Sequence, residues 1–214
     1  MSSLPIGQLK ATDLWGAYNN VTFAIRQAIL KIATATLVQV VSCTNDGGVS
    51  PVGFVSVQLL VNQQNAAAVG IEEGQLVDLP YVRIQGGANA VILDPQPGDI
   101  GIAVFASRDI STVVATKKQA NPATFRAYDF SDGLYVGGVL NGVPTQYVQF
   151  ASGGITVVSQ NQITLQAPTV AVQGNLTVSG TTDGIDDGTF AGISVETHVH
   201  SGVQSGGSDT GPPV

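Results

Sequence analysis

The chain has 214 residues, of which only 11% are charged, and its 15 acidic and 8 basic side chains give a net charge of -7. A protein this acidic repels phosphate backbones and anionic lipid heads, which argues against nucleic-acid binding. The single cysteine, Cys43, excludes an internal disulfide and any metal cluster built from several cysteines.

The first segment, residues 1–35, is expected to be helical. From Asp13 to about Thr34, apolar residues follow a heptad-like period at Leu14, Tyr18, Val21, Ile25, Ala28 and Ile32. Thr12 or Asp13 could cap its start. The favoured interpretation is a helix that docks on the next domain, and the alternative is a helix that contacts another subunit or a neighbouring protein. The N-terminus lacks a basic region followed by an apolar run, so we expect no signal peptide and synthesis in the cytoplasm.

Residues 36–118 carry the pattern of short strands. The apolar runs lie at 36–42, 52–61, 76–84, 90–93 and 100–106, and turn residues separate them. Five or six short strands with frequent turns are typical of a small antiparallel barrel or sandwich. The span fits a five-stranded barrel of the oligonucleotide/oligosaccharide-binding (OB) type. Residues 119–152 are irregular, and we expect a transition segment with a short helix or strand within it.

Residues 153–195 repeat a short pattern of apolar pairs. The pairs are Ile155/Val157, Ile163/Leu165, Val170/Val172 and Leu176/Val178, with small polar residues between them. Each pair predicts a short strand with one buried face, and no such strand is stable alone. A single-chain β-helix would need longer and more regular coils. The pattern therefore favours three chains that wind around one axis as a triple-stranded, intertwined β-helix.

The last segment, residues 196–214, contains the only two histidines, His198 and His200. Residues i and i+2 of an extended strand face the same side, so both imidazoles point one way. Three chains on a threefold axis would supply six nitrogen ligands and complete an octahedron. Such a set suits Fe(II), Ni(II) or Co(II) better than Zn(II), which prefers four ligands. The small residues from Ser201 to Gly211 would allow three backbones to pack closely at an apex.

A metal enzyme is the rival interpretation of these histidines. Glu196 would complete a triad of two histidines and one carboxylate. Only fourteen residues follow His200, however, which is too few to wall a substrate pocket. The carboxylates in Asp94/Asp99 and Asp186-Asp187 have turn contexts, and we expect them to be solvated. The sequence therefore predicts a protein that is not an enzyme and has no small-molecule substrate.

The order of these parts resembles the baseplate assembly protein V family, the membrane-piercing central spikes of contractile-tailed phages. The resemblance rests on residues 97–111, PGDIGIAVFASRDIS, and on the apex, residues 197–213, THVHSGVQSGGSDTGPP. It implies a homotrimer with an OB-type barrel, a triple-stranded β-helix and a pointed apex. It also implies one iron ion (Fe2+) per trimer, held by the pairs of His198 and His200. Some members carry calcium or chloride near the tip, and no residue here is assigned to them.

The function implied by this resemblance is mechanical. The chain would sit in the virion, in the tail baseplate, bound to a tail hub protein and aimed at the host outer membrane. Two alternatives share the architecture: a trimeric short tail fibre or receptor-binding protein, and a related secretion-system spike. A glycan-binding fibre predicts exposed aromatic residues, but aromatic residues make up only 6% of the chain.

Overall fold

The structure is a computed structural model that describes residues 15–65, 67–72, 74, 76–184, 187–199, 201–202 and 206. The chain divides into two compact units, Met1–Thr145 and Gln146–Val214. The helices and strands of the first unit are α1 (Ala17–Leu30), β1 (Ala35–Cys43), β2 (Phe54–Leu59), β3 (Gln63–Gln64), β4 (Gly70–Ile71), β5 (Leu76–Pro80), β6 (Ile84–Gly86), β7 (Asn89–Val91), β8 (Ile100–Phe105), α2 (Ser111–Thr116) and β9 (Gly133–Gly138). The described strands of the second unit are β10 (Tyr147–Ala151), β11 (Gly154–Val158), β12 (Thr189–Phe190) and β13 (Ile193–Ser194).

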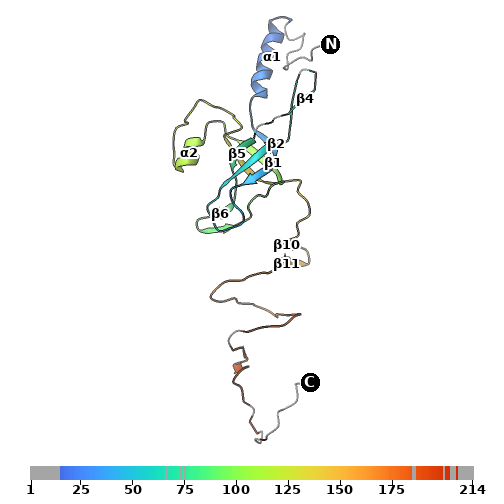
Figure 1. Ribbon diagram of the computed structural model, residues 1–214, viewed down its shortest axis with the longest axis vertical. Coiled ribbons are helices and arrows are strands. Elements are labelled where there is room, and N and C mark those ends of the chain that lie inside the picture. The colour runs from blue at the N-terminus through green and yellow to red at the C-terminus, as the bar shows by residue number, and fades with distance from the viewer. Residues whose placement is uncertain are drawn as a thin grey trace. The chain divides into compact units, whose positions relative to one another are not determined.

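A curled antiparallel sheet forms the body of the first unit. Its strands lie in the order β5-β2-β1-β8-β9, and Figure 1 labels β5, β2 and β1 of this sheet. The sheet curls far enough to join its two edges, because Tyr81, which follows β5, forms a parallel bridge with Tyr135 of β9. The backbone N–H of Val82 also donates to the carbonyl of Tyr135 over 2.9 Å. The predicted mostly-β fold with an N-terminal helix is therefore confirmed.

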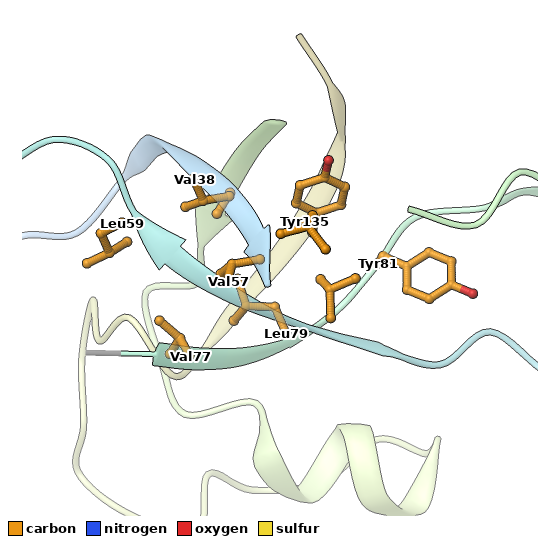
Figure 2. Packing of buried hydrophobic residues seen from close by; sticks show 10 residues of the cluster. Val38, Val57, Leu59, Val77, Leu79, Tyr81 and Tyr135 are labelled. Carbon is orange, nitrogen blue, oxygen red and sulfur yellow. The ribbon is translucent and has the colours of Figure 1, made fainter. Parts of the chain in front are cut away.

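The core of the first unit lies on one face of this sheet. The strands β1, β2 and β5 alternate between buried and more exposed residues, as a period of two requires. The ten buried members are Val38, Val40, Val55, Val57, Leu59, Val77, Leu79, Tyr81, Ala103 and Tyr135. Figure 2 shows Val57 and Leu79, from neighbouring strands, on the same face as Val38. The apolar runs of the sequence thus become strands because every second residue packs into this core.

A glycine allows β9 to pack against β8. A Cβ atom on Gly101 would collide with the side chain of Tyr135 and with the carbonyl oxygen of Gly137. The absent side chain makes room for the Tyr135 ring, which is 2% exposed. The fifth strand of the sheet lies inside the predicted transition segment 119–152, and α2 lies inside the predicted barrel range 36–118.

The helix α1 has no buried residue among its fourteen. Trp15, Tyr18 and Ile29, for example, are all more than half exposed. The favoured interpretation of a helix docked on the next domain is therefore not what the structure shows. The candidate capping residues, Thr12 and Asp13, lie outside the described residues. Within the described residues, no helix combines the length and the apolar character needed to cross a bilayer.

The second unit contains few regular elements. β10 and β11 form an antiparallel hairpin in which Phe150 pairs with Ile155. From residue 159 to residue 188 the described part of the chain contains no strand or helix, and Figure 1 shows a long run of irregular chain after β11.

Candidate functional site

The apolar pairs of the second unit are exposed to solvent. All eight side chains of the four predicted pairs, Ile155/Val157, Ile163/Leu165, Val170/Val172 and Leu176/Val178, are more than half exposed. No described residue between 146 and 206 is buried, and only Val158, Ser159 and Ser194 are half-buried. The described part of this unit therefore has no hydrophobic core of its own.

A tight hairpin precedes the two histidines. β12 and β13 pair through Thr189 with Ser194 and through Phe190 with Ile193. The two residues between them, Ala191 and Gly192, have positive φ angles of 50° and 81°. This is the backbone that a two-residue type I′ hairpin turn requires, and glycine adopts it without strain. The hairpin closes where the N–H of Val195 donates to the carbonyl of Gly188 over 2.7 Å.

Hydrogen bonds connect this hairpin to the segment that carries the histidines. The carboxylate of Asp187 accepts from the N–H of Glu196 over 2.9 Å. The hydroxyl oxygen of Ser194 accepts from both the N–H and the hydroxyl of Thr197, each over 2.8 Å. Hydrogen bonding from the Ser194 hydroxyl and from backbone N–H groups lowers the pKa of the Asp187 carboxyl. An ionised Asp187 thus holds the chain just before His198.

The ring of His198 is oriented by the backbone. Its Nδ1 lies 3.0 Å from the carbonyl oxygen of Val195. A carbonyl oxygen only accepts hydrogen bonds, so Nδ1 carries the proton, and in a neutral ring the lone pair lies on Nε2. A backbone carbonyl on one imidazole nitrogen is the usual partner that fixes a metal-binding histidine. His198 thus has the tautomer that a metal ligand through Nε2 needs.

The other residues predicted for this site have different outcomes. His200 lies outside the described residues, so the structure does not place it relative to His198. Glu196 lies in a turn at residues 195–197 rather than in an extended strand, so the spacing argument for the rival metal triad does not hold. Within the part of the chain that the structure describes, no group of three histidine, cysteine, aspartate or glutamate side chains could hold a metal ion.

The expectation that Asp94 is a solvated turn residue is wrong. Asp94 is 6% exposed, and its carboxylate accepts from the Tyr81 hydroxyl and from the Arg83 guanidinium, each over 2.6 Å. Burial opposes ionisation of Asp94, but these two hydrogen bonds outweigh it and lower its pKa. The N–H of Gly47 also donates to this carboxylate over 3.0 Å. Asp94 therefore links the loop that contains Gly47 to the segment that contains Tyr81 and Arg83.

A second cluster, built around the buried carboxylates of Asp109 and Asp132, holds the loop around α2. Arg126 reaches the carboxylates of Asp109 and Asp132 at 3.2 and 3.1 Å. Hydrogen bonds from Ser111, and from the Thr124 hydroxyl, lower the pKa of the Asp109 carboxyl well below its usual range. Every carboxylate of this cluster has fixed donors, so the cluster ties the loop together. No local sequence pattern indicates this cluster, because its members lie up to 23 residues apart.

Two family models match the chain. Residues 50–138 match a model described as the phage protein Gp138 N-terminal domain, and residues 192–214 match one described as the GpV apex motif. The chain is related to phage baseplate spike proteins. This finding confirms the resemblance to the baseplate assembly protein V family. No curated protein matches the chain.

The two matched regions coincide with the structural features described above. The first match spans β2 to β9 and so covers most of the curled sheet, together with the loop that carries α2. The second begins at Gly192, in the turn between β12 and β13, and includes both histidines. The exposed apolar pairs lie between the two matches. The relationship therefore supports a component of a phage tail baseplate with a spike apex.

Proposed function

We propose that this protein is the central spike of a contractile phage tail, a homotrimer whose C-terminal part is driven tip first through the host outer membrane. The observation that carries this proposal is the exposure of all eight apolar side chains in the four pairs between 155 and 178. Large apolar areas that stay exposed on one chain indicate a surface that another molecule covers. The matched apex motif that follows them supports a spike as that assembly.

Three copies of the same chain would cover these side chains most economically. The pairs recur every six to eight residues, so each chain offers short apolar faces at regular intervals along its length. Three chains around one axis would direct these faces inward, and each strand edge would hydrogen-bond to the next chain. Such winding leaves no free sheet edge, so bending the shaft would require many backbone hydrogen bonds to break together. That rigidity is what a piercing device needs.

The curled sheet would form the wider end of the spike and contact the tail hub protein. In chain order the strands of this sheet are β1, β2, β5, β8 and β9. A parallel bridge joins Tyr81, just after the third of them, to Tyr135 in the fifth. This arrangement supports a barrel of the OB type. The aromatic residues Tyr81 and Tyr135 are buried in its core. These two rings therefore stabilise the sheet and are not available to stack on sugars.

An iron ion would close the tip. His198 and His200 of three chains would supply six neutral nitrogen donors, and the hydrogen bond from Nδ1 of His198 to Val195 suits ligation through Nε2. The ion would cross-link the three chain ends, which are otherwise the part of a fibre most prone to fraying. A site filled by six protein ligands leaves no position for a substrate, so we propose that the protein is not an enzyme.

Immunogold labelling of intact and contracted tails tests this function. Antibodies against this chain should label intact tails on the axis, at the distal end of the baseplate. After contraction on outer-membrane vesicles, the label should lie on the lumenal side of the membrane. Label on peripheral fibres, or label that stays outside the vesicles after contraction, would contradict the proposal and favour the tail fibre.

A further inference from the structure

The helix α1 presents an apolar seam that the structure leaves uncovered. We define the α1 seam as Tyr18, Val21, Ile25 and Ala28, whose spacing of three, four and three residues places them on one side of the helix. All four are exposed, and Tyr18 is 81% exposed. Trp15 and Ile29, both more than half exposed, flank the seam in the same heptad position. A fourteen-residue helix is marginal in water without a partner, so this surface needs one.

We propose that three copies of α1 pack in parallel along this seam and form a second trimer contact at the N-terminal end of the protein. The inference rests on the proposed homotrimer, because a shared axis brings the three helices together. The backbone after the helix is fixed, since the N–H of buried Ala33 donates to the carbonyl of Tyr128 over 3.2 Å. Each helix therefore leaves its sheet from a defined point, and a threefold axis would repeat that point around itself.

The residue types of the seam suit three helices. The seam residues take the a and d positions of the heptad. β-Branched residues occur in both, with Ile25 at an a position and Val21 at a d position, and this combination favours three strands over two. Ala24, beside the seam, is small enough for the helix backbones to approach closely. Arg26 is the only charged residue between Trp15 and Leu30, so parallel copies would meet with little like-charge repulsion. Its guanidinium covers the ring of Phe23 at 5.5 Å, on the side away from the seam.

The apolar surface exposed on α1 is also a substantial share of what a standard interface buries per partner. The side chains of Trp15 and Tyr18 are 73% and 81% exposed, and together they could remove about 300 Å² per chain from water. The aliphatic residues Val21, Ile25 and Ile29 add to this, and a standard interface buries about 800 Å² per partner. Three helices on one axis would bury most of these side chains, whereas the curled sheet of the same chain buries none of them.

Cysteine cross-linking of the full chain tests the inference. In a Cys43→Ala background, Ala28→Cys places a thiol on the seam, and Leu30→Cys places one on the opposite side of the helix as the matched control. Both positions are exposed. Mild oxidation of dilute protein should link two of three chains in the Ala28→Cys variant several times more efficiently than in the control. Native mass spectrometry of the same samples should show trimers for both variants.

The outcomes separate this inference from the proposed function. Trimers with equal cross-linking of the two variants would overturn the α1 contact alone and leave the hub protein as the partner of the seam. Monomers without cross-links would overturn both proposals. A second variant, Val21→Asp/Ile25→Asp, should keep the trimer through its C-terminal part but lose helical circular dichroism. An unchanged helical signal in that variant would contradict the inference, because the helix would then be stable without its seam.

Discussion

The guanidinium of Arg83 lies 2.6 Å from the carboxylate of Asp94, and both side chains are almost completely withdrawn from solvent. Arg83, between β5 and β6, also donates to the carbonyl of Ser50 over 2.6 Å, so the pair connects the loop after β1 with the loop between β7 and β8 that carries Asp94. Removing one member of a buried pair leaves the other without a counter-charge, and this costs more than the loss of an exposed pair. The Arg83–Asp94 pair therefore ties together the loops that carry Ser50 and Asp94.

The first prediction concerns pH. The pKa of Asp94 is lower in the folded protein than its ordinary value of 3.8, so the unfolded chain binds the proton more readily. The stability that this group contributes is present above about pH 4 and is lost as the pH falls through the folded pKa. Thermal unfolding of the first unit should therefore shift to lower temperature in acid, and Asp94→Asn should weaken this shift. The exposed Asp46→Asn is the control, and equal pH profiles for the two variants would contradict the role of Asp94.

The second prediction concerns the core of the curled sheet. Leu79 is fully buried, whereas Leu76 on the same strand is 53% exposed. Leu79→Ala should lower the free energy of unfolding of the first unit by about 2–5 kcal/mol, because it removes buried methyl groups and leaves a cavity. Leu76→Ala should have a much smaller effect. Hydrogen exchange of the amides of β2 and β5 provides the measurement, and similar protection in both variants would show that the core lies elsewhere.

Local patterns predicted much of the first unit. The runs at 36–42 and 100–106 correspond to β1 and β8. They could be predicted because a half-buried strand alternates apolar and polar residues, and both runs show this alternation. β9 was harder to identify, since it is short, glycine-flanked and stabilised by pairing with β8 rather than by its own pattern. The burial of Asp94 depends on Arg83, eleven residues before it, and no local pattern reports such a pairing.

The candidate site is a different case, because in the proposed trimer its partners are copies of the same chain. The sequence indicates that another surface must pack on the apolar pairs, and the structure of one chain shows these pairs exposed. Neither contains the molecule that packs on them. His198 could be singled out from the spacing of the histidines alone. Its hydrogen bond to Val195 could not, because that bond depends on the turn at residues 195–197.

The third prediction concerns the shared core. Leu165→Asp should weaken or abolish trimer formation, because three carboxylates would be placed on the inner face of the proposed shaft. Thr164→Asp introduces the same charge one residue earlier, on the opposite face of an extended strand, and should be tolerated. Sedimentation equilibrium at several protein concentrations compares the two variants. Equal dissociation of both would mean that the apolar pairs do not face the axis.

The fourth prediction concerns the tip. The double change His198→Ala/His200→Ala should abolish the proposed iron binding and make the last residues of the chain sensitive to proteases, while the curled sheet keeps its protection. Val199→Ala alters the residue between the two histidines and should leave both iron content and protease resistance unchanged. Full iron content in the double variant would show that other residues hold the metal.

Native mass spectrometry of the full chain, combined with elemental analysis, tests the central claim most directly. We predict one species of three chains with one iron ion bound. A monomer in dilute solution whose residues 146–199 are protected from hydrogen exchange, or one metal ion per chain, would contradict the account, since the apolar pairs and the histidines would then be satisfied without partners.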